Sequence, residues 1–163
     1  MKKIIISTII YVLTSLTVCG QASKRSYKKF TDTDFKVGDI ILAPDIWFSL
    51  SGGCQIMPQS KDSVKIIADF IQKHPSFKIE IGSHTDSRSK KEPNLILSKY
   101  RAKSVVDYLT KELLLPADNF EYKGYGSSQL LIPDLTIKKI SDKTEKEKLH
   151  QKNRRVEIKI LRI

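Results

Sequence analysis

The chain has 163 residues, with 29 Lys and Arg against 18 Asp and Glu, which gives a formal net charge of +11. This length fits one domain of ordinary size and is too short for a transporter or a large barrel. Hydrophobic residues make up 40% of the chain, and that much apolar surface can form a core, which excludes a mostly disordered protein. The two cysteines are too few for a disulfide framework or a zinc site of four thiolates.

Residues 1–22 predict an export signal. Lys2 and Lys3 form a basic start, an apolar stretch follows, and small residues up to Ala22 offer a cleavage site. The apolar stretch is shorter than the roughly 20 residues that a membrane-spanning helix needs. A second interpretation stays open, because the sequence Leu-Thr-Val-Cys resembles a lipoprotein processing box and would make Cys19 an acylated first residue. Both interpretations place the protein outside the cytoplasm.

The remaining chain predicts a basic linker over residues 23–38, without a core pattern, and one domain over residues 39–163. The domain opens with the apolar run Ile40–Phe48, in which Pro44 favours an edge strand or a bulged one. Residues 51–53 then predict a turn.

Apolar residues with the spacing of one helix face occur twice in the next part of the chain. The first such helix lies behind the candidate cap Ser60 and ends before Pro75. The second extends from about Leu97 to Leu114. Between them Phe77–Ile81 alternates apolar and polar residues, which predicts a half-buried strand.

The last part of the chain repeats this alternation. A strand is predicted over Phe120–Tyr122, and it runs into a turn at Gly124–Gly126. A polar helix or loop is predicted over Ser141–Gln151, and a final strand over Val156–Ile160. The order β-α-β-α-β-α-β predicts an α/β layered fold with helices packed on a mixed sheet of four strands. The alternation does not fix the order of the strands in that sheet.

A polar loop over residues 82–94 separates the second strand from the second helix, and loops of this length often carry function. Arg101 lies at the edge of the apolar stripe of that helix, where its guanidinium needs a partner, because an unpaired buried charge is costly. Asp86, at the exit of the strand, is the candidate partner. The spacing alone favours an internal salt bridge, whereas a zwitterionic ligand would place its ammonium on Asp86 and its carboxylate on Arg101.

Five short motifs follow one another along the domain. They are Ile79–Asp86, Asn94, Leu97–Ala102 with the pattern Leu-Ser-x-x-Arg-Ala, Gly124–Gly126 and Asn153–Glu157. Together they resemble the OmpA-like peptidoglycan-binding domain of OmpA-type porins, peptidoglycan-associated lipoproteins and flagellar stator proteins. The resemblance covers about residues 40–160 and implies non-covalent binding of the peptide stem of peptidoglycan, whose diaminopimelate residue is held at this site.

The resemblance also assigns roles to individual residues. The family's aspartate matches Asp86 and its arginine matches Arg101, while Thr85 would offer backbone or hydroxyl groups to the ligand. The family usually has Gly where this chain has Arg88 and Ser89, so Ser89 would be strained if that position needs a positive φ. The candidate ligand-binding residues are Thr85, Asp86, Asn94, Arg101, Arg154 and Arg155.

Two other functions compete with peptidoglycan binding. An enzyme is disfavoured because no Ser or Cys nucleophile motif accompanies His84 and Asp86, and no metal-ligand spacing joins the three histidines; we therefore expect neither catalysis nor a cofactor. A polyanion binder, for example of lipopolysaccharide, or an envelope-assembly protein, is the alternative that the positive charge supports. Export and the lack of aromatic residues among the basic ones argue against nucleic acid.

The expected location is the periplasm or outer membrane of a Gram-negative-type cell envelope, with peptidoglycan as the partner. Attachment to the outer membrane has two open routes, a lipid on Cys19 or a membrane protein partner.

Overall fold

The computed structural model describes residues 25–49 and 53–163. The predicted export signal, the acylation of Cys19 and most of the turn at residues 51–53 fall outside these ranges. Within them, no helix has the length and apolar character needed to cross a membrane.

A mixed four-stranded sheet forms the centre of the fold, as the sequence predicts. Its strand order is β1-β4-β2-β3, so the strand that comes last along the chain lies between β1 and β2 and pairs antiparallel with both, whereas β2 and β3 are parallel. The strands are β1 (Ile40–Leu42), β2 (Lys78–His84), β3 (Phe120–Gly126) and β4 (Val156–Arg162).

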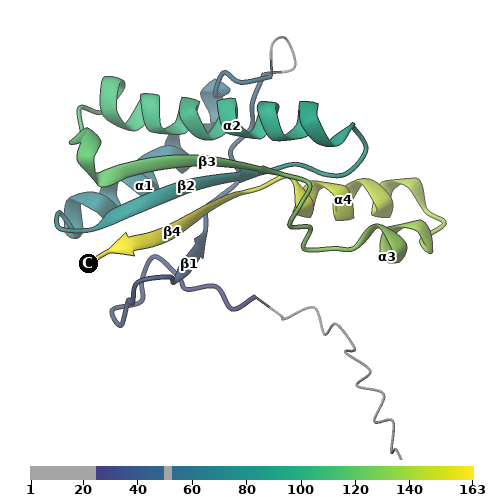
Figure 1. Ribbon diagram of the computed structural model, residues 1–163, viewed down its shortest axis with the longest axis horizontal. Helices are drawn as coiled ribbons and strands as arrows, with labels where there is room; N and C mark the ends of the chain where they lie inside the picture. Colours follow the sequence, from purple (N-terminus) through teal and green to yellow (C-terminus); the bar gives the residue numbers. More distant parts are fainter. Residues whose placement is uncertain (1–24, 50–52) are drawn as a thin grey trace, which may run out of the picture.

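Helices cover one face of this sheet and extend beyond one end of it. In Figure 1, α2 lies along β3 above the sheet, and α3 and α4 lie beyond the end where β2 and β3 finish and β4 begins. The helices are α1 (Lys61–Lys73), α2 (Lys91–Asp107), α3 (Asp134–Lys138) and α4 (Lys143–Asn153). The polar segment 141–151, predicted as a helix or a loop, is thus largely helical, and the short α3 has no counterpart among the predicted elements.

Three local predictions are wrong. The second helix begins at Lys91, earlier than predicted, and after Asp107 it continues only as a turn of π-helix, Tyr108–Glu112. The hydroxyl of Ser60 does not cap α1, because it accepts a hydrogen bond of 2.7 Å from the backbone N–H of Trp47. Gly124 is not in a turn, since β3 continues to Gly126.

Gly124 is required where α2 crosses β3. A Cβ atom at this position would lie 2.3 Å from the backbone nitrogen of Lys99 and 2.6 Å from Oγ of Ser98. The same serine hydroxyl accepts a hydrogen bond of 2.9 Å from the backbone N–H of Gly126. The glycines therefore allow the close approach of helix and strand. The sequence alone does not distinguish this role from a turn, because both favour glycine.

The core lies between the helices and the sheet face that carries Ile79, Ile81, Ile158 and Ile160, all fully buried. The segment predicted as a linker also contributes to it. Phe30 and Phe35 contact Phe70 of α1 edge-on, with ring centroids 5.5 and 5.3 Å apart. These two aromatic residues are too widely spaced to form a helix or strand pattern, which is why the sequence shows no core signal there.

The opposite sheet face carries a buried polar network around Glu157. Its carboxylate accepts hydrogen bonds from Nε of Arg155 at 2.7 Å and from the hydroxyl of Tyr27 at 2.6 Å, and it forms an ion pair with Arg25. Nε2 of His84 lies 3.2 Å from Oε2 of Glu157, without the geometry of a hydrogen bond. Burial of Glu157 acts to raise the pKa of its carboxyl group, but these partners outweigh burial and hold the pKa well below its usual range.

Leu114 ends the second helical segment with a backbone φ of 55°, in the left-handed region, and the residue is 82% exposed. A leucine in this conformation costs about 1–2 kcal/mol, of which glycine avoids most. We expect Leu114→Gly to raise the free energy of unfolding by about 0.5–1 kcal/mol, measured by urea denaturation. The matched change Leu135→Gly, also at an exposed leucine but inside α3, is expected to lower it. Destabilisation by both changes would contradict this account.

Candidate functional site

The candidate site lies at the end of the sheet where β2 finishes and β4 begins. Because β2 continues to His84 and α2 starts at Lys91, the predicted polar loop shortens to residues 85–90. A pocket of about 350 Å³ opens beside this loop. Its wall includes Trp47, Phe48, Arg88, Arg101, Glu147 and Arg154.

Asp86 is 7% exposed, and its carboxylate is held by two arginines. Oδ2 accepts hydrogen bonds from Nη2 of Arg88 at 2.7 Å and from Nη1 of Arg154 at 2.5 Å, and Oδ1 accepts one from the backbone N–H of Arg88 at 3.1 Å. Burial acts to raise the pKa of Asp86, but the hydrogen bonds from Arg88 and Arg154 prevail and hold it at about 2. Asp86 is therefore an anion at any physiological pH.

Arg101 reaches the same pocket from α2 in a different electrostatic setting. Its Nε donates a hydrogen bond of 2.8 Å to the carbonyl oxygen of Gly53, and its guanidinium lies 5.2 Å from the ring centroid of Phe48. Burial lowers the pKa of Arg101 from its ordinary value. Within residues 25–49 and 53–163 this guanidinium makes no ion pair. It is a partly buried cation whose remaining N–H groups can donate to an anion.

Asp86 and Arg101 thus do not form the direct salt bridge that sequence spacing alone favours. Arg88, two residues from Asp86, and Arg154, between α4 and β4, reach the carboxylate instead. Ser89 does not have a positive φ, because Leu114 is the one non-glycine residue with that conformation in the described part of the chain. The loop therefore takes a path that the side chains of Arg88 and Ser89 can adopt without strain.

Three further predicted site residues, Asn94, Arg155 and Thr85, differ in what they contact. Asn94 is buried and braces the loop, since its side-chain amide donates to the carbonyl oxygens of Asp86 at 3.0 Å and of Ser89 at 3.2 Å. The guanidinium of Arg155 is engaged by Glu157 and by backbone carbonyl groups. Thr85 is buried near the pocket, and its hydroxyl has no hydrogen-bond partner in the structure.

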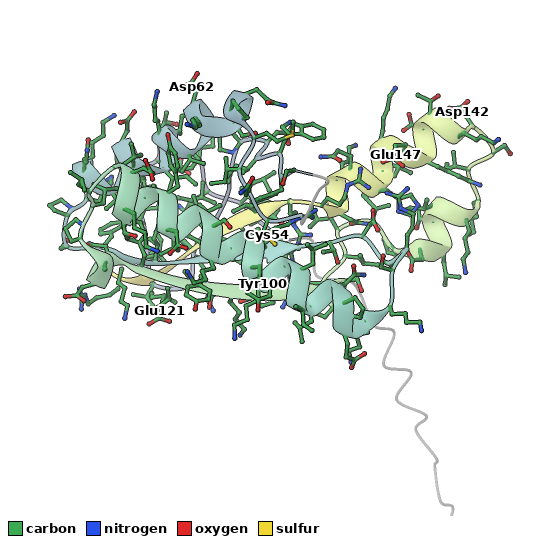
Figure 2. The ribbon with its side chains drawn as sticks, turned by 90° about the horizontal axis from the view of Figure 1, so that it is seen from above. Cys54, Asp62, Tyr100, Glu121, Asp142 and Glu147 are labelled. Atoms are coloured by element: carbon green, nitrogen blue, oxygen red, sulfur yellow. The ribbon has the colours of Figure 1, made fainter. Side chains whose placement is uncertain are left out.

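Sequence reasoning missed Glu147 and the role of Arg88. Glu147 lies on α4 (Figure 2), and its carboxylate accepts hydrogen bonds from Arg88 at 2.8 Å and from Arg154 at 2.6 Å. Nothing in the charged sequence of α4 distinguishes this glutamate from its neighbours. Arg88 stands out in the sequence as a departure from the glycine of the family pattern, and the structure shows that its side chain faces the site.

Comparison with known proteins places this fold in a family. The porin F of the outer membrane of Pseudomonas fluorescens is 33% identical over 81 residues, which are 50% of this chain and 24% of that protein. The chain thus corresponds to about a quarter of that porin.

Among solved structures, the cell wall anchor of the type VI secretion system from Pseudomonas aeruginosa aligns with a TM-score of 0.55 at 22% identity, over 76% of this chain and 80% of that one. The peptidoglycan-associated lipoprotein from Burkholderia pseudomallei aligns with a TM-score of 0.52 at 20% identity, over 71% and 86%. At these identities the likeness is one of fold.

The family model gives the decisive match. The model described as the OmpA family matches residues 50–157, a range that includes β2, α2, β3 and the start of β4 with all six predicted site residues. The OmpA-like domain is a non-catalytic binding and anchoring domain. This chain belongs to the OmpA family.

Proposed function

We propose that this protein binds peptidoglycan non-covalently in the cell envelope and anchors itself there, with the diaminopimelate residue of the stem peptide as the recognised group. The observation that carries this proposal is the pocket in which the guanidinium of Arg101 has no acidic partner among the residues that the structure describes, while the anionic Asp86 lies beside the pocket wall. A free amino-acid end offers a carboxylate to the first and an ammonium to the second.

The names of the relatives support the same function. One solved neighbour is described as a cell wall anchor and another as a peptidoglycan-associated lipoprotein. We further propose that the protein is exported to the periplasm or the outer membrane, held there by a lipid on Cys19 or by a membrane protein partner. A mass spectrum of the mature N-terminus distinguishes an acylated Cys19 from a chain that starts at Ser23.

Retention by purified peptidoglycan sacculi tests the proposal. We expect Arg101→Ala and Asp86→Asn each to weaken retention at least about tenfold, because each removes a charge-assisted hydrogen bond to the ligand. The matched controls are Arg162→Ala at the far end of β4 and Glu112→Ala, both exposed, which change the net charge by the same amounts. Full retention of both site variants, with an unchanged far-UV circular dichroism spectrum, would contradict the site assignment.

A salt series separates this function from general polyanion binding. Binding of a polyanion such as lipopolysaccharide should collapse between about 50 mM and 200 mM salt, because it depends on the release of many counterions. A single pocket that binds one zwitterionic residue should lose far less of its affinity over the same range of salt. If the affinity falls steeply with salt, and if Arg162→Ala and Lys90→Ala weaken binding as much as Arg101→Ala does, the polyanion function is favoured.

A further inference from the structure

The carboxylate of Asp86 is already occupied within the protein itself. Both of its oxygens accept hydrogen bonds, and three of the four donors belong to Arg88: its backbone N–H, its Nε and its Nη2. Arg88 and Arg154 line the pocket, whereas Asp86 lies behind them. A ligand ammonium entering the pocket therefore meets the guanidinium groups before it can meet the carboxylate.

Arg88 is the more easily displaced of the two arginines. Its side chain is 50% exposed, against 24% for Arg154. Arg154 is fixed further by Gln151, whose side-chain oxygen accepts hydrogen bonds of 3.0 and 2.5 Å from it. Arg88 has Glu147 as a second anionic partner at 2.8 Å, so its charge stays compensated if it leaves Asp86.

The two ends of the site are thus unequal. Arg101 presents N–H groups that no acidic side chain of the described chain engages, so a ligand carboxylate can bind without displacing anything. The ammonium has to compete with the guanidinium of Arg88, which donates two hydrogen bonds to Oδ2 of the same carboxylate. The exchange is possible because half of the Arg88 side chain is exposed, so water and Glu147 can replace the carboxylate of the buried Asp86 as partners of the guanidinium.

We propose that Arg88 is a specificity-determining residue that acts as an internal counter-ion: it occupies the position of the ligand's ammonium on Asp86 and must swing towards Glu147 before an amino-acid ligand binds fully. This inference rests on the proposed function, because it takes Asp86 as the ammonium-binding group. It follows that the wild-type protein binds amino-acid ends less tightly than its pocket permits, and that an ammonium group on the ligand adds less to its affinity than it adds when Arg88 is removed.

Two soluble probes test the inference. Meso-diaminopimelic acid carries carboxylates and ammonium groups, whereas pimelic acid has the same carbon chain and carboxylates without the amines. The sequence contains one tryptophan, Trp47, and it lines the pocket, so its fluorescence reports on both titrations. Calorimetry gives an independent dissociation constant.

We expect Arg88→Ala to bind diaminopimelic acid about tenfold more tightly than the wild type and to bind pimelic acid no more tightly. Lys90→Ala removes one positive charge from the same loop at an exposed position and should change neither constant. Arg88→Gln, which keeps much of the length without the charge, should tighten diaminopimelate binding in the same direction and serves as the second variant if the alanine protein folds poorly.

The outcomes separate the two proposals. Unchanged or weaker binding of diaminopimelic acid by both Arg88 variants overturns the counter-ion role, and so does an equal gain for pimelic acid, which would indicate a general effect on the pocket. If the wild type still binds sacculi and loses them on Arg101→Ala, the proposed function survives that result. Failure of the wild type and of the Arg88 variants to bind either sacculi or diaminopimelic acid overturns both.

Discussion

Replacing Glu157 by alanine should lower the free energy of unfolding by about 3–5 kcal/mol, the cost of breaking a buried ion pair from one side. The residue is 5% exposed and is the common acceptor for Arg155, Tyr27 and Arg25. Its loss leaves the guanidinium of Arg155, itself buried, with backbone carbonyl groups as its remaining partners. The penalty is therefore mainly that of an uncompensated buried cation.

Urea unfolding at pH 7 measures this change, with Glu121→Ala as the control, because Glu121 is an exposed glutamate of the same sheet whose ion pair with Lys78 contributes at most about 1 kcal/mol.

The dependence of stability on pH gives a second test. The pKa of Glu157 is lower in the folded than in the unfolded protein, so its stabilising contribution is complete above the unfolded pKa and is lost as the pH falls. We expect wild-type stability to decline below about pH 5, and Glu157→Gln to show a flatter profile. Equal stability of the two alanine variants would rule out the network.

Gly124→Ala is expected to destabilise the protein by about 3 kcal/mol, at the upper end of typical overpacking penalties. The new methyl group would meet the backbone of α2 at Lys99, which cannot rotate away as a side chain could. The helix has to move outward, and the hydrogen bond between Ser98 and Gly126 is stretched or broken.

Thermal and urea denaturation measure the loss, with Lys123→Ala as the neighbouring exposed control, for which a change below about 1 kcal/mol is expected. The displacement also has a functional consequence, because α2 carries both Asn94 and Arg101. Sacculus retention by Gly124→Ala should therefore fall even at temperatures where the variant remains folded. Wild-type stability in this variant would show that α2 and β3 are not in close contact at this point.

The parts of the fold that the sequence predicts well are those in which apolar residues bury one face. The face of α1 that packs on the core has regular helical spacing, and apolar and polar residues alternate along Phe77–Ile81, where β2 begins, and along Val156–Ile160 in β4. The beginning of α2 escaped prediction because it buries Asn94 and Ser98 and packs on glycines, so its contact surface is small and polar. In α4 the buried residue is Asn153, whose amide holds the backbone of residues 131–132, and no apolar period can reveal that.

The site shows a similar limit. Motif spacing indicates Asp86 and Arg101, because each follows a recognisable strand or helix pattern. The contact between Arg88 and Glu147 joins residues 59 positions apart, through two exposed side chains, and depends on where α4 packs. Pairs of surface charges far apart in the sequence leave no local sequence signal, so the groups that surround Asp86 can be identified only from the structure.

The strand order has a consequence for how the chain acquires its structure. The backbone of Ile41 pairs with that of Ile158, and among the four strands of the described sheet β1 pairs with β4 alone. During synthesis, β1 and β2 cannot take their final positions in the sheet until β4, which lies between them, has been made. A domain whose sheet is completed by β4 stays open until that strand has been made, and its folding is expected to be slow because the decisive contacts span most of the chain.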